Sequence, residues 1–293
     1  MLKGSIVALI TPFKNNGSVD YDQLKELIEF HIKNKTDGIV LLGTTAESPT
    51  LSHEEKTEIV KIGLEVVNKR VPVIVGSGTN DTGESILLSK EFSSMGADYL
   101  LVITPYYNKT NDNGLVKHFN VIADNSCCPL ILYNVPGRTG MSISENVIKE
   151  VSKHKNIIGV KEASGDISYA AKVAKYLSKD FVMFSGNDDI IVPMMSLGAS
   201  GVISVLANIA PTQTHNICEL CLDGNYEAAR TIQLKLLDFI NALFIETNPI
   251  PIKEAMNELG FNIGGYRLPL DYMSTNNKQV LVDRINKVKG EIY

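Results

Sequence analysis

The chain has 293 residues, 44% of them hydrophobic and 21% charged, and its formal net charge is −5. It is long enough to form either one large barrel or two domains of average size. The acidic balance and the lack of a dense Lys or Arg run in the sequence argue against a nucleic-acid partner. The first apolar run stops at Pro12, which is too early to span a membrane.

The sequence contains an adjacent pair of cysteines, Cys127 and Cys128, and a pair at helical spacing, Cys218 and Cys221. In a chain of ordinary enzyme size with no obvious export segment, this pattern is typical of a reducing cytosol, so we expect a cytoplasmic protein. Cys218 and Cys221 lack the second pair that would complete a zinc site, and packing in a helix core explains them better.

Apolar runs rich in β-branched residues recur along the first three quarters of the sequence. Near-continuous hydrophobicity of this kind is typical of strands that are covered on both faces. The eight predicted strands begin at Ser5, Gly38, Val71, Asp98, Pro129, Ile157, Phe181 and Gly201.

Helical patterns separate these runs. Apolar residues share one face of the helix predicted after Asp20, and Ser52 with Glu55 predicts a capping box at the start of the next helix. Eight βα units within residues 1–224 fit a closed parallel barrel better than a doubly wound sheet, which usually has fewer strands and a glycine-rich nucleotide turn. The predicted fold class is therefore α/β, a (β/α)8 TIM barrel.

The strand signal stops after Gly224, and three helical segments follow, at about 226–247, 250–259 and 274–288. We predict a catalytic barrel domain over residues 1–224 and a C-terminal three-helix appendage over residues 225–293. Because no Pro/Ser-rich linker or charge block separates the two, we expect the appendage to pack against the barrel.

Polar residues at the carboxyl ends of the strands are the functional candidates, because this fold builds its active site there. Lys161 stands out, since the run IIGVKEAS places an amine inside an apolar strand, where an isolated ammonium is costly. Desolvation favours the neutral amine, which can attack a ketone and form an imine that acts as an electron sink. The alternative is a structural ion pair with Glu162 at the strand end.

Further polar residues follow neighbouring strands. Tyr133 ends the run ILYNVP, and Thr44 can link its phenol, a possible proton shuttle, to another donor. Thr45 with a backbone amide suits a small carboxylate, and Arg138 in the glycine-flanked loop PGRTG offers a planar fork for another. Taken singly, each has a plainer explanation: a rim tyrosine, turn threonines and a solvated arginine.

Motifs for other chemistries are incomplete. Gly76-Ser77-Gly78 lacks the third glycine of a dinucleotide fingerprint, and the sequence has no G-x-S-x-G elbow. None of the five histidines closes a predicted strand, which argues against a metal-dependent aldolase.

The segments ALITPF, GTTAESPTL, TPYYNK, YNVPGRTG, GVKEASGD and FSGND stand in the order and spacing of one family. Through them the chain resembles, almost end to end, the pyruvate-dependent lyases that include dihydrodipicolinate synthase and N-acetylneuraminate lyase. The resemblance implies a condensation of pyruvate with L-aspartate-4-semialdehyde to 4-hydroxy-tetrahydrodipicolinate, in lysine and diaminopimelate biosynthesis. It also implies a homo-oligomer, usually a tetramer built as a dimer of dimers, and no metal or organic cofactor.

The resemblance implies a catalytic role for each of four residues. Lys161 would form the imine with pyruvate, and Tyr133 would shuttle protons. Thr44 would link Tyr133 to Tyr107, which a neighbouring subunit would supply.

The resemblance also implies how the substrates bind. Thr45 and its amide would hold the pyruvate carboxylate, Arg138 would bind the semialdehyde carboxylate, and main-chain groups near Gly186 and Ile203 would complete the site. The sequence PGRTG favours the semialdehyde, because sialate lyases differ after the tyrosine. Two alternatives stay open: an aldolase that cleaves a sialic or sugar acid, and a catalytically idle barrel that serves as a binding or regulatory module.

Two departures from the family pattern bear on these expectations. Ala46 replaces a usual glycine, so the turn after Thr45 would differ if that position needs a positive φ. In lysine-inhibited members, a pocket at the subunit interface has a histidine at the position of Lys56. The Lys56 amine would add a second cation there and repel an incoming ammonium. We therefore expect weak or no inhibition by lysine. The candidate allosteric residues are Ser48, Pro49, His53, Lys56, Asn80, Glu84 and Tyr106.

Overall fold

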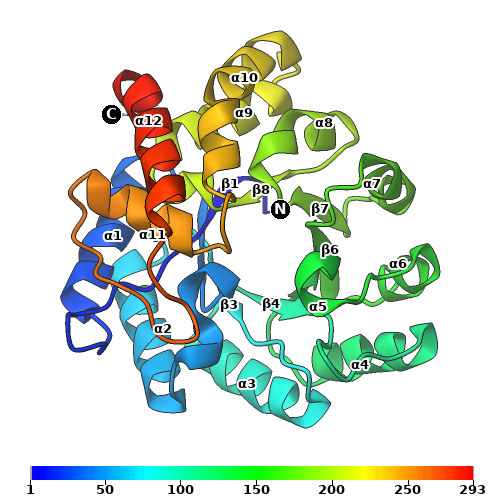
Figure 1. The fold of residues 1–293 in the computed structure, drawn as a ribbon. Helices are drawn as coiled ribbons and strands as arrows, with labels where there is room; N and C mark the ends of the chain where they lie inside the picture. Colours follow the sequence, from blue (N-terminus) through cyan, green and yellow to red (C-terminus); the bar gives the residue numbers. More distant parts are fainter. Residues whose placement is uncertain (1, 293) are drawn as a thin grey trace.

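The computed structural model describes residues 2–292, and within them eight parallel strands close into a barrel in chain order. Helices alternate with the strands and form a ring around them (Figure 1). The predicted barrel is confirmed, and each predicted strand start lies within two residues of the observed one. The strands are β1 (Gly4–Ala8), β2 (Gly38–Leu41), β3 (Val73–Gly76), β4 (Tyr99–Ile103), β5 (Leu130–Asn134), β6 (Ile157–Glu162), β7 (Val182–Ser185) and β8 (Gly201–Ser204).

The outer helices begin where the sequence supplies caps. Helix α1 (Tyr21–Lys33) follows Asp20, whose carboxylate accepts a hydrogen bond from the backbone N–H of Gln23. Helix α2 (His53–Val67) opens with the predicted capping box of Ser52 and Glu55. The remaining barrel helices are α3 (Thr82–Met95), α4 (Asp112–Asp124), α5 (Pro136–Thr139), α6 (Glu145–Val151), α7 (Ile167–Ala174), α8 (Ile191–Ser196) and α9 (Pro211–Leu222).

The strands bury side chains on both faces, as their near-continuous apolar runs predict. One buried cluster, which includes Ile131, Tyr133 and Ile203, fills the inside of the barrel. A larger cluster joins the outer faces of the strands to the helices. Because successive side chains of a strand point to opposite faces, neighbouring residues of one strand end belong to different environments.

The glycines of Gly76-Ser77-Gly78 serve close packing at the end of β3. A Cβ on Gly76 would lie 2.2 Å from the carbonyl oxygen of Leu42, and one on Gly78 would lie 2.5 Å from the backbone nitrogen of Ile103. Only a residue without a side chain allows the backbone to approach its neighbours this closely.

The C-terminal appendage lies on one side of the ring (Figure 1). Its helices are α10 (Tyr226–Ala242), α11 (Ile250–Glu258) and α12 (Thr275–Ile292). Helix α10 packs on α9 and α12, and its Gln233 accepts a 2.8 Å hydrogen bond from the N–H of Val192 in α8. The appendage thus packs against the barrel helices. The domain division at residue 224 stays a prediction, and its outer limits, 1 and 293, lie outside the described residues.

Some predicted helix bounds were wrong. The helix predicted to reach residue 247 ends at Ala242, and the segment that follows it turns toward the barrel mouth, where Asn248 contacts Thr45. Helix α12 continues beyond the predicted residue 288 to Ile292. The described part of the chain contains no helix with both the length and the apolar character needed to cross a membrane.

Candidate active site

Lys161 lies inside the barrel, near the end of β6. Only 6% of its surface is exposed, and its Nζ lies 4.4 Å from the centre of the Tyr133 ring. The two residues are register partners on β5 and β6, so their side chains point the same way. Burial beside an aromatic face removes water from the amine, which is the environment that its proposed chemistry needs.

The ion-pair alternative for Lys161 was wrong, because strand alternation places Glu162 on the opposite face of the sheet. The Glu162 carboxylate accepts hydrogen bonds from Nδ2 of Asn134 and from the backbone N–H of Ser164, each 2.6 Å long. Burial raises the pKa of Glu162, and these two hydrogen bonds oppose that effect. Glu162 therefore supports the outer side of β6 and does not engage the amine of Lys161.

Asp188 is a site residue that the sequence reasoning missed. Its Oδ2 accepts hydrogen bonds from the backbone N–H groups of Val205 (3.0 Å) and Leu206 (2.9 Å), and so holds the chain just after β8. Burial raises the pKa of Asp188, while nearby donors and the charge of Lys161 oppose the shift. The sequence signal that could have identified Asp188 is the acidic pair directly after FSGN, because this pair follows a strand end at the barrel mouth.

The loop after β2 presents Thr44 and Thr45 in a single 3-10 turn, η1 (Thr44–Ala46). The positive φ that a glycine would favour occurs at Glu47 (φ 56°) and not at Ala46, so the substitution at Ala46 places no strain on this turn. The hydroxyl of Thr11 donates a 2.7 Å hydrogen bond to the carbonyl of Ala46 and ties the turn to the segment that follows β1. The concern about this departure from the family pattern was therefore unfounded.

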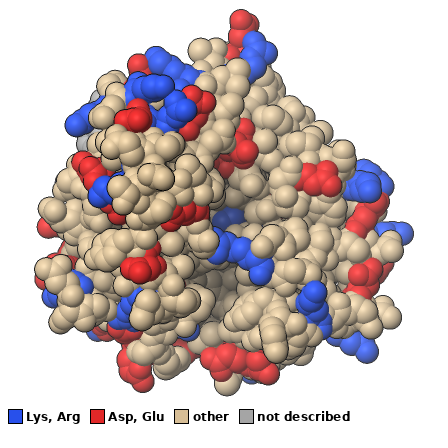
Figure 2. Space-filling model, in the orientation of Figure 1, with Lys and Arg blue, Asp and Glu red and all other residues tan. Residues whose placement is uncertain are grey.

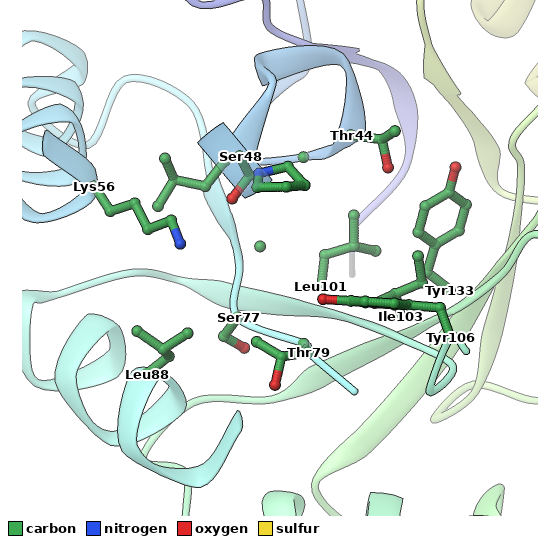
Figure 3. Close-up of a pocket in the computed structure, with 15 residues that line it drawn as sticks. Thr44, Ser48, Lys56, Ser77, Thr79, Leu88, Leu101, Ile103, Tyr106 and Tyr133 are labelled. Atoms are coloured by element: carbon green, nitrogen blue, oxygen red, sulfur yellow. The ribbon is translucent and has the colours of Figure 1, made fainter. Parts of the chain in front are cut away.

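A cavity of about 130 Å³ extends from Thr44 toward α2. Thr44 and Tyr133 stand side by side at one end, and the amine of Lys56 points in from the other (Figure 3). The lining also includes four further hydroxyl-bearing residues, Ser48, Ser77, Thr79 and Tyr106. Among the lining residues, which all belong to the described range, Lys56 is the one charged side chain.

The cavity unites only part of the candidate allosteric set. Ser48, Pro49, Lys56 and Tyr106 line it. The other three candidates make contacts elsewhere: His53 lies 3.4 Å from Glu91, Asn80 accepts a hydrogen bond from Asn108, and Asp81 caps the backbone of Glu84.

Tyr107 is not among the residues that line the cavity with Thr44 and Tyr133. Its side chain is 92% exposed, and its backbone has a positive φ of 67°. The expectation that a neighbouring subunit supplies Tyr107 to the site stays a prediction.

The remaining predicted binding residues surround the barrel mouth, where Figure 2 shows a hollow with Lys or Arg atoms inside and beside it. Arg138 lies in the helical turn α5, not in an open loop as predicted, and its Nη2 donates to the carbonyl of Asn248 (2.7 Å). The N–H of Gly186 donates to the carbonyl of Glu162 (2.7 Å), and Ile203 is buried inside the barrel. Gly186 thus follows β7, the neighbour of the strand that carries Lys161, and Ile203 lies one strand further, on β8.

The cysteines and histidines do not form a metal centre in the part of the chain that the structure describes. No group of three His, Cys, Asp or Glu side chains there could hold a metal ion. Cys218 and Cys221 lie in the apolar core around α9, as predicted. The expectation that the reaction needs no cofactor stays a prediction.

Comparisons with known proteins agree with these features. A 4-hydroxy-tetrahydrodipicolinate synthase of Clostridium perfringens is 53% identical over 292 residues, covering 100% of both chains. The enzyme of the same name from Brachyspira hyodysenteriae is 49% identical over 98% of both. The crystal structure of a chloride-inhibited dihydrodipicolinate synthase from Acinetobacter baumannii, complexed with pyruvate, superposes with a TM-score of 0.97 at 40% identity and covers 100% of both chains. Residues 1–288 match the model of the dihydrodipicolinate synthetase family, and the chain belongs to that family.

Proposed function

We propose that this chain condenses pyruvate with L-aspartate-4-semialdehyde to 4-hydroxy-tetrahydrodipicolinate through an imine at Lys161. The observation that carries the proposal is the buried Lys161 amine over the Tyr133 ring, with Glu162 turned to the other face of the strand. The relatives named above support the predicted class, a carbon–carbon lyase acting on pyruvate, and favour the synthase over a sialic- or sugar-acid lyase.

The proposed chemistry begins at the buried amine of Lys161. Nζ of Lys161 attacks the ketone carbon of pyruvate, water leaves, and loss of a methyl proton gives an enamine. The enamine carbon attacks the aldehyde carbon of the semialdehyde, and a C–C bond forms. The amino group of the product then attacks the imine carbon, closes the ring and releases Lys161. Tyr133, beside Thr44, moves the protons that these steps require.

We further propose that Thr45 binds the pyruvate carboxylate and Arg138 the carboxylate of the semialdehyde, with main-chain groups near Gly186 and Ile203 completing the site. The proton path would continue from Thr44 to the Tyr107 of a neighbouring subunit in a homotetramer. The exposed position of Tyr107 supports an intersubunit role. Such a biosynthetic enzyme would act in the cytoplasm.

Borohydride reduction with pyruvate tests the imine and its selectivity together. We expect mass spectrometry to find one reduced pyruvate adduct, on Lys161, in both the wild type and an Arg138→Ala variant. Condensation by Arg138→Ala should fall by about 10²-fold or more, because a charge-assisted bidentate contact to the semialdehyde is lost. The absence of an adduct in the wild type would favour the alternative of a catalytically idle barrel. Full semialdehyde turnover by Arg138→Ala would contradict the proposed role of Arg138 in binding the semialdehyde carboxylate.

Lysine is expected to leave the reaction rate nearly unchanged at millimolar concentration. The half-buried amine of Lys56 points into the cavity, and no carboxylate among the lining residues offsets its repulsion of a lysine ammonium. Initial rates measured across a lysine titration check this, with Lys56→Gln as the comparison, since removing the charge should strengthen binding. Complete inhibition of the wild type at sub-millimolar lysine would contradict the prediction.

A further inference from the structure

The segment between α10 and α11 reaches the barrel mouth at Asn248. The side-chain amide of Asn248 donates a 3.0 Å hydrogen bond to Oγ1 of Thr45, which lies 203 positions away in the chain. The main-chain carbonyl of Asn248 accepts a 2.7 Å hydrogen bond from Nη2 of Arg138. One residue of the appendage therefore contacts both side chains that we propose to bind the substrate carboxylates.

The surroundings hold Asn248 firmly in place. Its side chain is buried, and its neighbour helix α11 is tied to the same loop by Lys253, whose Nζ lies 2.8 Å from Oε1 of Glu47. Neither partner of that ion pair is exposed to more than 1%. Two contacts thus set the position of the Asn248 amide relative to Thr45. One is the hydrogen bond from Asn248 itself, and the other is the ion pair between Lys253 of α11 and Glu47 in the loop after β2.

The direction of these hydrogen bonds matters for anion binding. A hydroxyl has one hydrogen to donate and accepts through its lone pairs. Because Asn248 donates to Thr45, the hydroxyl hydrogen of Thr45 is left for another acceptor, as a carboxylate requires. The guanidinium of Arg138 carries five N–H groups, and one bonded to the carbonyl of Asn248 leaves others to face a second carboxylate.

We propose that Asn248 is a positioning residue for the substrates. Its amide keeps the Thr45 hydroxyl as a donor toward the pyruvate carboxylate, and its carbonyl holds the guanidinium of Arg138 alongside. This inference rests on the proposed function and identifies what the C-terminal appendage contributes to it. The appendage then does more than cover the outer helices: it orients a substrate-binding hydroxyl.

Two substitutions of Asn248 separate the donor role from simple packing. The measurement is the pyruvate concentration that gives half-maximal Lys161 adduct after borohydride reduction. Asn248→Ala should raise it about 3- to 10-fold, the effect of one lost hydrogen bond. Asn248→Asp should raise it further, because its carboxylate takes the Thr45 hydrogen and repels pyruvate. The KM for the semialdehyde should change less, since the main-chain carbonyl that meets Arg138 remains in both variants.

A double-mutant cycle shows whether Asn248 acts through Thr45. In a Thr45→Val background, which has no hydroxyl to orient, Asn248→Ala should cause no further rise in the half-saturating pyruvate concentration. The same rise in both backgrounds, or a value for Asn248→Ala within twofold of the wild type, overturns the proposal.

Asn257→Ala supplies a matched control from the same appendage. Asn257 donates to the carbonyl of Gly264 and accepts from the N–H of Ile263, both at 2.9 Å, so its loss should lower the melting temperature without changing pyruvate binding. If Asn257→Ala weakens pyruvate binding as much as Asn248→Ala, the effect is structural and the proposal fails. A wild type that forms no adduct would instead reject the proposed function itself.

Discussion

Lys161→Met is expected to lower the condensation rate by about 10³-fold or more, because it removes the amine that we propose forms the imine. The protein should remain folded, since methionine fills a similar apolar volume and removes an amine that is only 6% exposed. Steady-state rates and borohydride trapping with pyruvate measure the loss, and thermal unfolding checks the fold.

Lys117→Met is the control for this prediction, because Lys117 is an exposed residue of helix α4 on the outer ring. It should retain wild-type rates and the wild-type adduct. An adduct that persists in Lys161→Met, or a rate within tenfold of the wild type, would show that another lysine carries the chemistry.

Lys253→Met is expected to reduce the free energy of unfolding by about 3–5 kcal/mol, because it leaves the Glu47 carboxylate buried without its counter-charge. Lys253 is fully buried, 2.8 Å from Glu47 and 4.3 Å from the centre of the Phe13 ring. Burial lowers the pKa of Lys253, and the charge of Glu47 opposes that shift. Denaturant unfolding at fixed protein concentration measures the change.

The double variant Glu47→Gln with Lys253→Met distinguishes an unpaired charge from a general packing loss. It should be more stable than Lys253→Met alone, since no isolated carboxylate remains in the core. The backbone N–H of Arg267 can still donate to the amide oxygen that replaces Oε2 of Glu47, a contact of 3.1 Å in this structure. Equal stability of the single and double variants would mean that the charge of Glu47 is not the cause.

The repeating pattern of the sequence was enough to determine the barrel. Eight apolar runs alternate with amphipathic helices, and such two-sided burial of parallel strands has few other solutions. The sequence predicted Lys161 within a strand and Tyr133, Thr44 and Thr45 at strand ends. Because the carboxyl ends of all strands meet at one end of such a barrel, these residues were expected there. The roles that the resemblance implies for these residues stay proposals until the adduct is mapped.

Tertiary structure alone decided which groups face one another. Strand alternation requires that Lys161 and Glu162 point apart, but only barrel closure and register determine which of them faces inward. The hydrogen bond from Asn248 to Thr45 and the ion pair from Lys253 to Glu47 join residues 203 and 206 positions apart. A local pattern carries no signal for contacts at such separation, because they depend on where the folded barrel brings the appendage.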